Sequence, residues 1–314
     1  MYDLVIIGAG PGGLSAGLYA GRSRLNTLII EKDAVGGQIA ISDEIENYPG
    51  GKAGEPESGK ALTDRMKQQV ERFNVPIKKA NVVKVQLEGD VKKIELANGE
   101  TIEAKAVIIA TGANPRKLNV PGEKEYTTKG VSYCATCDGD FFTDLEVFVV
   151  GARNSAVEEA MYLTKFARKV TVLCRREKLR CDAVVEERAK ANDKLEVMYH
   201  TSIKEIRGHE VVDQLLLVNN ETGEEWVYDA DEDDGILGVF VFVGYNPANE
   251  LIKDQLELDE SGYIITDEKM RTNIKGVYAI GDIRNTVLRQ VITAASDGAI
   301  AAVTAEKELK DLDY

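Results

Sequence analysis

Residues 2–32, YDLVIIGAGPGGLSAGLYAGRSRLNTLIIEK, decide the fold of this chain. The apolar run at residues 2–7 predicts a strand buried in a parallel sheet. A glycine-rich turn follows it, and the small-residue stretch at residues 14–23 predicts a helix that leads into a second strand ending at Glu31. This order of strand, glycine turn, helix, strand and acid predicts a βαβ unit that binds a dinucleotide.

Each glycine of the turn has a physical reason. Gly8 allows the tight turn, Gly10 lets the backbone approach a pyrophosphate, and Gly13 lets the helix pack closely on the strand. The helix N-terminus offers unpaired N–H groups and the positive end of a dipole to the same phosphates. Glu31 is then expected to hold the hydroxyls of a ribose. The alternative is a glycine-rich turn without a ligand.

The same order recurs in the middle of the chain. Residues 146–151 (EVFVVG) predict a strand, residues 155–167 a helix, and residues 169–176 (KVTVLCRR) another strand. The chain therefore contains two nucleotide-type βαβ units, which repeat an architecture rather than a sequence. The stretches at residues 113–123 (ANPRKLNVPGE) and 244–250 (GYNPANE) read as linkers between them.

Length and composition limit the classes of function. The 314 residues suffice for two domains with full cores, and no apolar run reaches the roughly 18 residues of a membrane span. The apolar N-terminus runs straight into the glycine turn, so it reads as a first strand and not as a signal peptide. A net charge of −14 argues against nucleic acid and anionic membranes as partners. With only four cysteines, we expect a cytoplasmic protein.

Two of the four cysteines lie in VSYCATCDGD, residues 131–140. The spacing of Cys134 and Cys137 in a chain with βαβ units predicts a redox dithiol, because a thiol near a helix start with a partner three residues on exchanges readily. Asp138 follows directly, and a carboxylate there can exchange a proton with a leaving thiolate. Capping of a helix is the other role open to this acid, and both roles can coexist.

The alternatives for the dithiol are half of a zinc site and a pair of inert buried cysteines. Cys174 and Cys181 do not form a second CxxC, and neither histidine stands near them in the sequence. Structural zinc sites take four ligands of this kind. We therefore expect no metal.

Further motifs make the chain resemble a known family. They are CATCD, the strand ends ATG (residues 110–112) and AIGD (residues 279–282), residues 35–50 (VGGQIAISDEIENYPG), and residues 289–302 (RQVITAASDGAIAA). With them the chain resembles the low-molecular-weight thioredoxin reductases over essentially its whole length. The resemblance implies an α/β fold with two Rossmann-like dinucleotide-binding domains of the three-layer ββα type, the second inserted in the first.

The same resemblance implies a domain plan. Residues 1–114 and 246–314 are expected to form one FAD domain, and residues 115–245 a central domain that carries the CxxC and an NADPH-type site. A homodimer is also implied. Because the dithiol has to meet both the flavin and thioredoxin, we expect a rigid-body rotation of one domain against the other.

The resemblance also assigns roles to individual residues. Cys137 is expected to face the flavin and take its electrons, Cys134 to attack the disulfide of thioredoxin, and Asp138 to act as general acid and base. The positions that match the family's FAD site are Gly8, Gly10, Gly13 and Glu31 for the ADP half, Gln38 and Asn47 along the flavin, Thr111 and Gly112 at the strand end, Asp282 on the ribityl chain, and Arg289, Gln290 and Val291 at the isoalloxazine end.

The second nucleotide turn departs from the family. In VVGARNSAVEEA, Gly151 and Ala156 suit the first and third fingerprint positions, but Arg153 replaces the glycine that lets the backbone touch a pyrophosphate. We expect its guanidinium to occupy the space of the ligand; the alternatives are that it points away or pairs with a phosphate. Nearby, Cys174 replaces the family's histidine in CRREKLR, while the family's arginines remain at 175, 176 and 180.

This combination resembles the ferredoxin-dependent flavin thioredoxin reductases, which keep the FAD site and the CxxC but lack a working NADPH site. We therefore expect reduced ferredoxin as the electron donor. The alternatives are an NADPH-dependent thioredoxin reductase, an oxygen-dependent dithiol oxidase and a non-catalytic flavin redox sensor. The basic residues expected to steer an acidic ferredoxin are Arg153, Lys165, Arg168, Lys169, Arg175, Arg176, Lys178 and Arg180; a solvated basic face is the other interpretation of this cluster.

Overall fold

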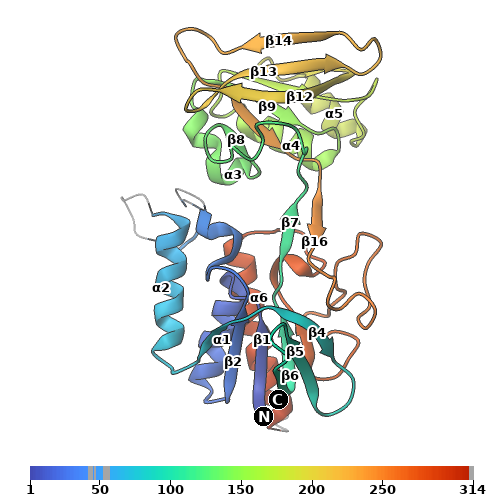
Figure 1. Ribbon diagram of the computed structural model, residues 1–314. Coiled ribbons are helices and arrows are strands. Elements are labelled where there is room, and N and C mark those ends of the chain that lie inside the picture. Colours follow the sequence, from blue (N-terminus) through green and yellow to red (C-terminus); the bar gives the residue numbers. More distant parts are fainter. Residues whose placement is uncertain (42–44, 46, 52–56, 311–314) are drawn as a thin grey trace. The chain divides into compact units, whose positions relative to one another are not determined.

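The chain divides into two compact units in a computed structural model that describes residues 1–41, 45, 47–51 and 57–310. Unit 1 comprises Met1–Asn114 and Asn246–Tyr314, and unit 2 comprises Pro115–Tyr245. The chain crosses between them in β7 (Ala113–Pro115) and β16 (Tyr245–Pro247), two strands that pair with each other (Figure 1). Part of the motif expected at residues 35–50, namely 42–44 and 46, lies outside the described residues.

Unit 1 is built on one twisted sheet. Its strand order within the described residues is β3-β2-β1-β6-β5-β4, and β17 pairs with β6. All pairs are parallel except β4 with β5 and β5 with β6, which are antiparallel. The strands are β1 (Tyr2–Ile7), β2 (Thr27–Glu31), β3 (Ile77–Lys79), β4 (Val82–Gln86), β5 (Lys92–Leu96), β6 (Thr101–Ile109) and β17 (Val277–Ala279).

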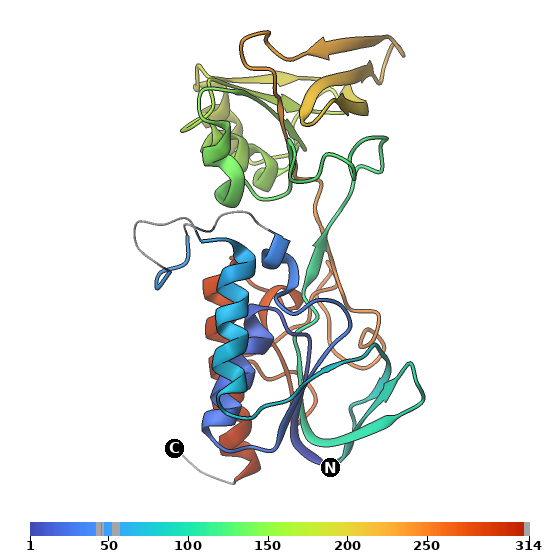
Figure 2. The same cartoon turned by 60° about the vertical axis from the view of Figure 1, so that its left-hand side comes forward.

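Three helices of unit 1, α1 (Pro11–Arg22), α2 (Gly59–Glu71) and α6 (Val291–Leu309), gather on one face of this sheet, as Figures 1 and 2 both show. Alternation along β1 explains the layers, because successive strand residues point to opposite faces. Leu4 and Ile6 pack in the core under the helices, whereas Val5 and Ile7 pack in a second core on the other face. Two short 3₁₀ turns, η1 (Gly37–Ile41) and η3 (Gly281–Ile283), complete the unit.

Unit 2 has a parallel sheet of order β11-β10-β9-β15-β8 and a separate antiparallel sheet of order β12-β13-β14. The strands are β8 (Val131–Ser132), β9 (Glu146–Val150), β10 (Lys169–Leu173), β11 (Leu195–Met198), β12 (Thr201–Gly208), β13 (Val212–Asn219), β14 (Glu225–Asp229) and β15 (Gly238–Val241). The helices are α3 (Ala135–Asp138), η2 (Gly139–Phe142), α4 (Asn154–Leu163) and α5 (Ala183–Lys190).

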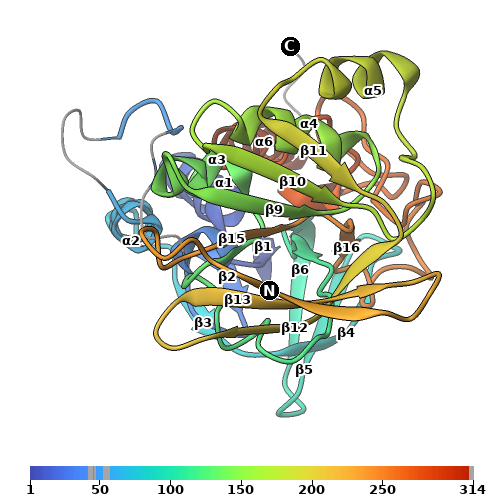
Figure 3. The same cartoon turned by 90° about the horizontal axis from the view of Figure 1, so that it is seen from above.

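Unit 2 has three stacked layers, which Figure 3 shows one after another: helices α4 and α5, the parallel sheet, and the antiparallel sheet. β9 again alternates between two cores. Val147 and Val149 pack with residues of α4, whereas Phe148 packs with Leu215 and Leu217 of β13. This helix, sheet, sheet arrangement is the three-layer ββα type that we predicted.

The structure confirms the predicted α/β fold and both βαβ units, and each unit also contains antiparallel strands beside its parallel ones. The β4–β5–β6 meander and the β12–β13–β14 sheet are antiparallel. The two hairpin turns of the β4–β5–β6 meander contain glycines with positive φ, namely Gly89 at 83° and Gly99 at 85°. An L-residue rarely adopts that conformation, so both are positions where a tight hairpin requires glycine.

Candidate active site

The turn between β1 and α1 combines tight packing with bare backbone. Gly8 has φ +112°, and a Cβ added there would lie 2.2 Å from the carbonyl oxygen of Ala110. A Cβ on Gly13 would lie 1.9 Å from the carbonyl oxygen of Gly8. A Cβ on Gly10, by contrast, would meet none of the described residues closer than the Cα of Gly37, 3.9 Å away. The turn is therefore locked at two glycines and open at the third, where a ligand can reach the backbone.

The N-terminus of α1 is prepared for an anion. Pro11 opens the helix, and Gly10, its N-cap residue, has no side chain with which to cap the first N–H groups. The Glu31 carboxylate at the end of β2 accepts hydrogen bonds from the backbone N–H groups of Ala9, at 2.7 Å, and Asp33, at 2.9 Å. The acid expected to bind a ribose is thus held against the glycine turn.

Thr111 and Gly112 lie just beyond β6 and join the two chain segments of unit 1. The Thr111 hydroxyl donates to the carbonyl of Ala248 at 2.9 Å, and the Ala248 N–H donates to the carbonyl of Gly112 at 3.0 Å. The ends of β1, β2, β6 and β17 share the carboxyl edge of a parallel sheet, which is where α/β proteins bind nucleotides.

Two amide side chains predicted for the site are placed by hydrogen bonds. Gln38 in η1 donates to the carbonyl of Ala113 and, at 3.0 Å, to the side-chain oxygen of Asn114. Asn47 donates to the side-chain oxygen of Gln290 at 3.2 Å. The structure therefore brings Asn47 next to Gln290, although they are 243 positions apart in the chain.

The polar groups at Asp282 and Arg289 are incompletely satisfied. The buried Nε of Arg289 has no hydrogen-bond partner among the described residues, although its guanidinium lies 4.2 Å from the ring centroid of Tyr263. The Asp282 carboxylate accepts no hydrogen bond from the described residues, and burial raises its pKa to about 6, with Arg289 opposing and Asp297 reinforcing the shift. Buried polar groups are rarely left unpaired. A dinucleotide with hydroxyls and a polar ring fits these two groups.

The Asp282 pKa predicts how stability depends on pH in protein prepared without a nucleotide. A carboxyl whose folded pKa lies above its unfolded value of 3.8 stabilises the fold below that value and loses this contribution as pH rises through about 6. Between pH 5.5 and 8 the loss should be roughly 1 kcal/mol. Urea unfolding of wild type and Asp282→Asn at both pH values measures it, because the variant should lack this difference; equal pH dependence in both proteins would contradict the prediction.

The dithiol lies at the carboxyl edge of the parallel sheet of unit 2. Cys134 follows β8 and is the N-cap residue of α3, and Cys137 lies in that helical turn. The two sulfurs form a disulfide with a Cα–Cα distance of 5.3 Å. The Thr136 hydroxyl contacts Cys134 Sγ at 3.4 Å. A disulfide between these two partly buried cysteines supports the redox interpretation of the CxxC.

Asp138 ends α3 and faces back toward the start of the turn. The Ser132 hydroxyl donates to its Oδ2 at 2.5 Å, and Ser132 Oγ also accepts from the backbone N–H of Cys134 at 3.1 Å. The structure therefore brings together the three residues predicted as catalytic, Cys134, Cys137 and Asp138. Ser132 could not be identified from the sequence, because a lone serine before a CxxC has no spacing that indicates its target.

Tyr133, immediately before Cys134, is anchored on both sides. Its hydroxyl donates to Glu123 at 2.9 Å, and this buried carboxylate also accepts from two backbone N–H groups. Lys117 Nζ lies 3.6 Å from the centre of the Tyr133 ring, and the Tyr245 hydroxyl donates to the Tyr133 carbonyl at 3.2 Å. Burial and the nearby Glu123 raise the pKa of Tyr133 above its ordinary value. The backbone that leads into the dithiol is thus fixed before Cys134.

The second nucleotide turn keeps the frame of the first. Gly151 has φ +153°, and a Cβ there would lie 2.6 Å from the carbonyl oxygen of Phe242. Ala156 is fully buried at the third fingerprint position. Arg153 occupies the position of Gly10 in the first turn, is exposed, and is the N-cap residue of α4 with an extended backbone. The frame is therefore retained and only the bare position is lost.

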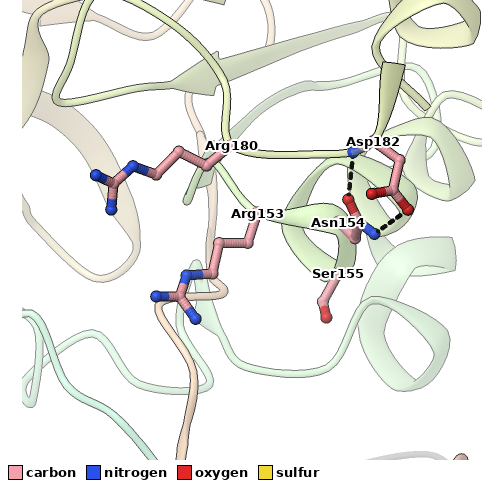
Figure 4. Close-up of a pocket in the computed structure, with 5 residues that line it drawn as sticks. All are labelled: Arg153, Asn154, Ser155, Arg180 and Asp182. Carbon is pink, nitrogen blue, oxygen red and sulfur yellow. Dashed lines mark hydrogen bonds between the residues drawn. The ribbon is translucent and has the colours of Figure 1, made fainter. Parts of the chain in front are cut away.

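Arg153 and Arg180 line an open pocket of about 460 Å³ beside the N-terminus of α4, together with Asn154, Ser155 and Asp182. A backbone bridge sets the two arginines next to each other, since Arg180 N–H donates to the Ala152 carbonyl. Figure 4 shows both guanidinium groups extending away from the hydrogen-bonded pair formed by Asn154 and Asp182. Within the described part of the chain, neither guanidinium has an acidic partner. Arg153 therefore points into the pocket and not away from it.

The predicted basic cluster is smaller than the sequence suggests. Arg168 pairs with Asp234 at 2.6 Å, and Lys169 pairs with Glu196 at 2.9 Å. Acidic residues from distant segments thus neutralise these two positions. The members of the cluster that are exposed and lack an ion pair among residues 1–41, 45, 47–51 and 57–310 are Arg153, Lys165, Arg175, Arg176, Lys178 and Arg180.

Two kinds of feature are absent from residues 1–41, 45, 47–51 and 57–310. No helix there is both long enough and apolar enough to cross a membrane. No group of three or more histidine, cysteine, aspartate or glutamate side chains is arranged there to hold a metal ion.

Comparisons with known proteins agree with this geometry. A family model described as pyridine nucleotide-disulphide oxidoreductase matches residues 2–298. A thioredoxin reductase of Peptoclostridium litorale is 52% identical over 99% of this chain and 98% of its own length. A thioredoxin reductase of Bacillus subtilis is 41% identical over 99% of this chain and 96% of its own.

Solved structures show the same relationship. A thioredoxin reductase from Streptococcus pyogenes is 46% identical, with a TM-score of 0.90 and 99% of each chain covered. The Lactococcus lactis thioredoxin reductase in its FR conformation is 42% identical, with a TM-score of 0.69 and coverage of 99% of this chain and 100% of its own.

Proposed function

This chain belongs to the low-molecular-weight thioredoxin reductases, within the pyridine nucleotide-disulphide oxidoreductases. From that premise we propose that it passes electrons from reduced ferredoxin to thioredoxin. It is a flavoprotein disulfide reductase with FAD as its cofactor. The disulfide Cys134–Cys137, with Asp138 at the end of the same turn, supports the thioredoxin half of the reaction. Arg153 supports ferredoxin as the donor.

The residues of unit 1 fit FAD. We propose that the open backbone at Gly10 and the N-terminus of α1 hold the pyrophosphate, and that Glu31 binds the adenosine ribose. Asp282 would accept hydrogen bonds from ribityl hydroxyls, and Arg289, whose buried Nε has no partner among the described residues, would hold the polar ring of the flavin. FAD bound there supplies a carrier that takes single electrons and delivers them in pairs. The other members of the proposed site are Gly8, Gly13, Gln38, Asn47, Thr111, Gly112, Gln290 and Val291.

We propose that the reduced dithiol then exchanges with thioredoxin. The Cys134 thiolate attacks one sulfur of the thioredoxin disulfide, so a mixed disulfide forms, the thioredoxin S–S bond breaks, and the leaving thiolate takes up a proton. Cys137 then attacks Cys134, which restores the Cys134–Cys137 disulfide and releases the second thioredoxin thiol. Asp138 accepts the proton of the attacking thiol and returns one to the leaving thiolate.

The choice of donor follows from a comparison of the two glycine turns. At Gly10 the backbone is bare, whereas at Arg153 a long cationic side chain lines the pocket where a pyrophosphate would approach. The carboxylate of Asp182 also lines that pocket, which is unfavourable for phosphates. Six exposed cations in the βαβ motif of unit 2 and just after it have no acidic partner among the described residues. They suit an acidic protein such as ferredoxin.

A second candidate donor is NADPH. It is favoured by the description of the family model, which names pyridine nucleotides, and by the paired guanidinium groups of Arg153 and Arg180. Guanidinium groups bind phosphate oxygens well when their geometry permits. The names of the relatives state the thioredoxin side of the reaction and leave the donor open for this chain.

Anaerobic reduction with NADPH and with reduced ferredoxin, side by side, tests the donor. We expect reduced ferredoxin to bleach the FAD absorbance and to drive thioredoxin reduction, while NADPH at micromolar concentration does neither at a comparable rate. Fast bleaching by NADPH would overturn the ferredoxin proposal and favour the second candidate. Peroxide formed from a small dithiol in air, without thioredoxin turnover, would instead indicate a dithiol oxidase.

We further propose that the protein is a cytoplasmic homodimer, as the family resemblance implies. Light scattering after size-exclusion chromatography should give about twice the mass of the 34.4 kDa chain. A single-chain mass at micromolar concentration would contradict the dimer.

A further inference from the structure

Ser132 links the two ends of the redox-active turn. It is the last residue of β8 and is 5% exposed. Its hydroxyl donates to Asp138 Oδ2 at 2.5 Å, and the same oxygen accepts from the Cys134 backbone N–H at 3.1 Å. One buried hydroxyl thus contacts the first residue of the dithiol and the acid that follows its second cysteine.

The surrounding backbone gives this contact its effect. The helix α3 is only four residues long, and the Asp138 N–H donates to the Cys134 carbonyl at 3.2 Å. The N-cap residue, Cys134, has no side-chain cap within the described residues, so its own N–H depends on Ser132. The side-chain bridge through Ser132 and the backbone bond from Asp138 to Cys134 close a ring around the turn. The Ser132 hydroxyl, at 2.5 Å, is therefore a contact that directs the Asp138 carboxylate back toward the start of the turn.

We propose that Ser132 is a positioning residue of the thioredoxin reaction, which orients the Asp138 carboxylate toward the dithiol and keeps it ready to accept a proton. This inference rests on the proposed role of Asp138. Ser132 itself transfers no electron and forms no covalent bond. It acts on one step, in which the Asp138 carboxylate takes the proton of the attacking thiol, and the resulting carboxylic acid later gives a proton to the leaving thioredoxin thiolate.

The chemistry gives the direction of the effect. A hydroxyl that donates to a carboxylate stabilises the ionised form, so its removal raises the pKa of the acid. A base with a raised pKa is protonated over a wider pH range, and the rate then declines at a higher pH. If the substitution only disturbed the fold of the turn, it would lower the rate at all pH values and leave the pH of that decline unchanged.

The test is a single-turnover reaction of pre-reduced enzyme, so that it does not depend on the electron donor. The FAD-loaded protein is reduced with dithiothreitol, desalted anaerobically and mixed with oxidised thioredoxin between pH 5.5 and 9. For Ser132→Ala we expect the acid limb of the rate profile to move up by about one pH unit. At a fixed pH on the acid side of the wild-type limb, the variant should then react about tenfold more slowly. At high pH the variant should approach the wild-type rate.

Three controls separate the explanations. Thr201→Val removes another buried hydroxyl of unit 2, which contacts a backbone carbonyl far from the dithiol in sequence, and should leave the limb unchanged. Ser132→Thr keeps the hydroxyl and should keep the wild-type limb. In an Asp138→Asn background, Ser132→Ala should add no pH shift.

An unshifted limb in Ser132→Ala, with FAD content and circular dichroism as in wild type, would overturn the inference while the proposed function stands. The same follows if Thr201→Val shifts the limb equally. Wild-type protein that reduces no thioredoxin in this assay would instead overturn the proposed function. The two failures are therefore distinguishable.

Discussion

Replacement of Cys137 by serine should lower thioredoxin reduction by roughly a thousandfold or more, because the exchange requires two sulfurs in sequence. Cys134 alone can form the mixed disulfide, but nothing in the turn can then release thioredoxin from it. Steady-state turnover with the donor that supports the wild type measures the loss. FAD should remain bound, since every residue proposed to hold it lies in unit 1.

The two cysteines should fail in different ways. Cys137→Ser should accumulate a covalent complex with thioredoxin that dithiothreitol reverses, whereas Cys134→Ser should not, because it lacks the attacking thiol. Cys181→Ser is the matched control, since Cys181 is free and partly exposed in the same unit; its turnover should stay within about twofold of wild type. A covalent complex formed by Cys134→Ser instead would reverse the assigned roles of the two sulfurs.

The sequence predicts best those parts of the molecule whose chemistry is local. The first βαβ unit follows from residues 2–32 because the apolar run, the glycines and the acid are close in the chain. Steric demands fix Gly8 and Gly13 within that turn. The same locality made the CxxC and Asp138 recognisable as one group.

Contacts between distant segments could not be predicted in this way. The incompletely satisfied Arg289 and the pairing of Asn47 with Gln290 depend on how α6 returns to the sheet. Neutralisation of Arg168 by Asp234 depends on a turn 66 positions away. No periodicity or spacing encodes such contacts, so a cluster of charges in the sequence overstated the cluster on the surface.

The antiparallel strands were missed for a different reason. Residues 82–109 contain turn glycines at positions 89 and 99 and the alternating pattern of hairpins, and both signals are local. They were outweighed by the βαβ pattern on either side. Ser132 is a third case, since its position in the sequence is unremarkable and only the fold of α3 brings Asp138 back to it.

Replacement of Arg153 by glycine should raise kcat/KM for NADPH by roughly tenfold to hundredfold. This range is expected when the removal of an obstructing side chain removes a steric cost of about 1–3 kcal/mol. Arg153 has an extended backbone with φ −97° and ψ 171° at the N-cap of α4. Glycine is tolerated at N-cap positions at small cost, so the variant should fold. It would restore at this turn the bare backbone that Gly10 provides in the first.

The matched variant Arg153→Lys separates bulk from charge. If bulk obstructs the pyrophosphate, lysine should keep NADPH turnover as low as in the wild type, and only glycine should raise it. The ferredoxin-driven rate should fall by no more than a few-fold in Arg153→Gly, because the other exposed cations of the cluster remain. If Arg153→Gly instead lowers NADPH turnover, Arg153 binds a phosphate oxygen, and the pocket beside α4 is a working nucleotide site. One substitution therefore decides whether this arginine closes the nicotinamide route or forms part of it.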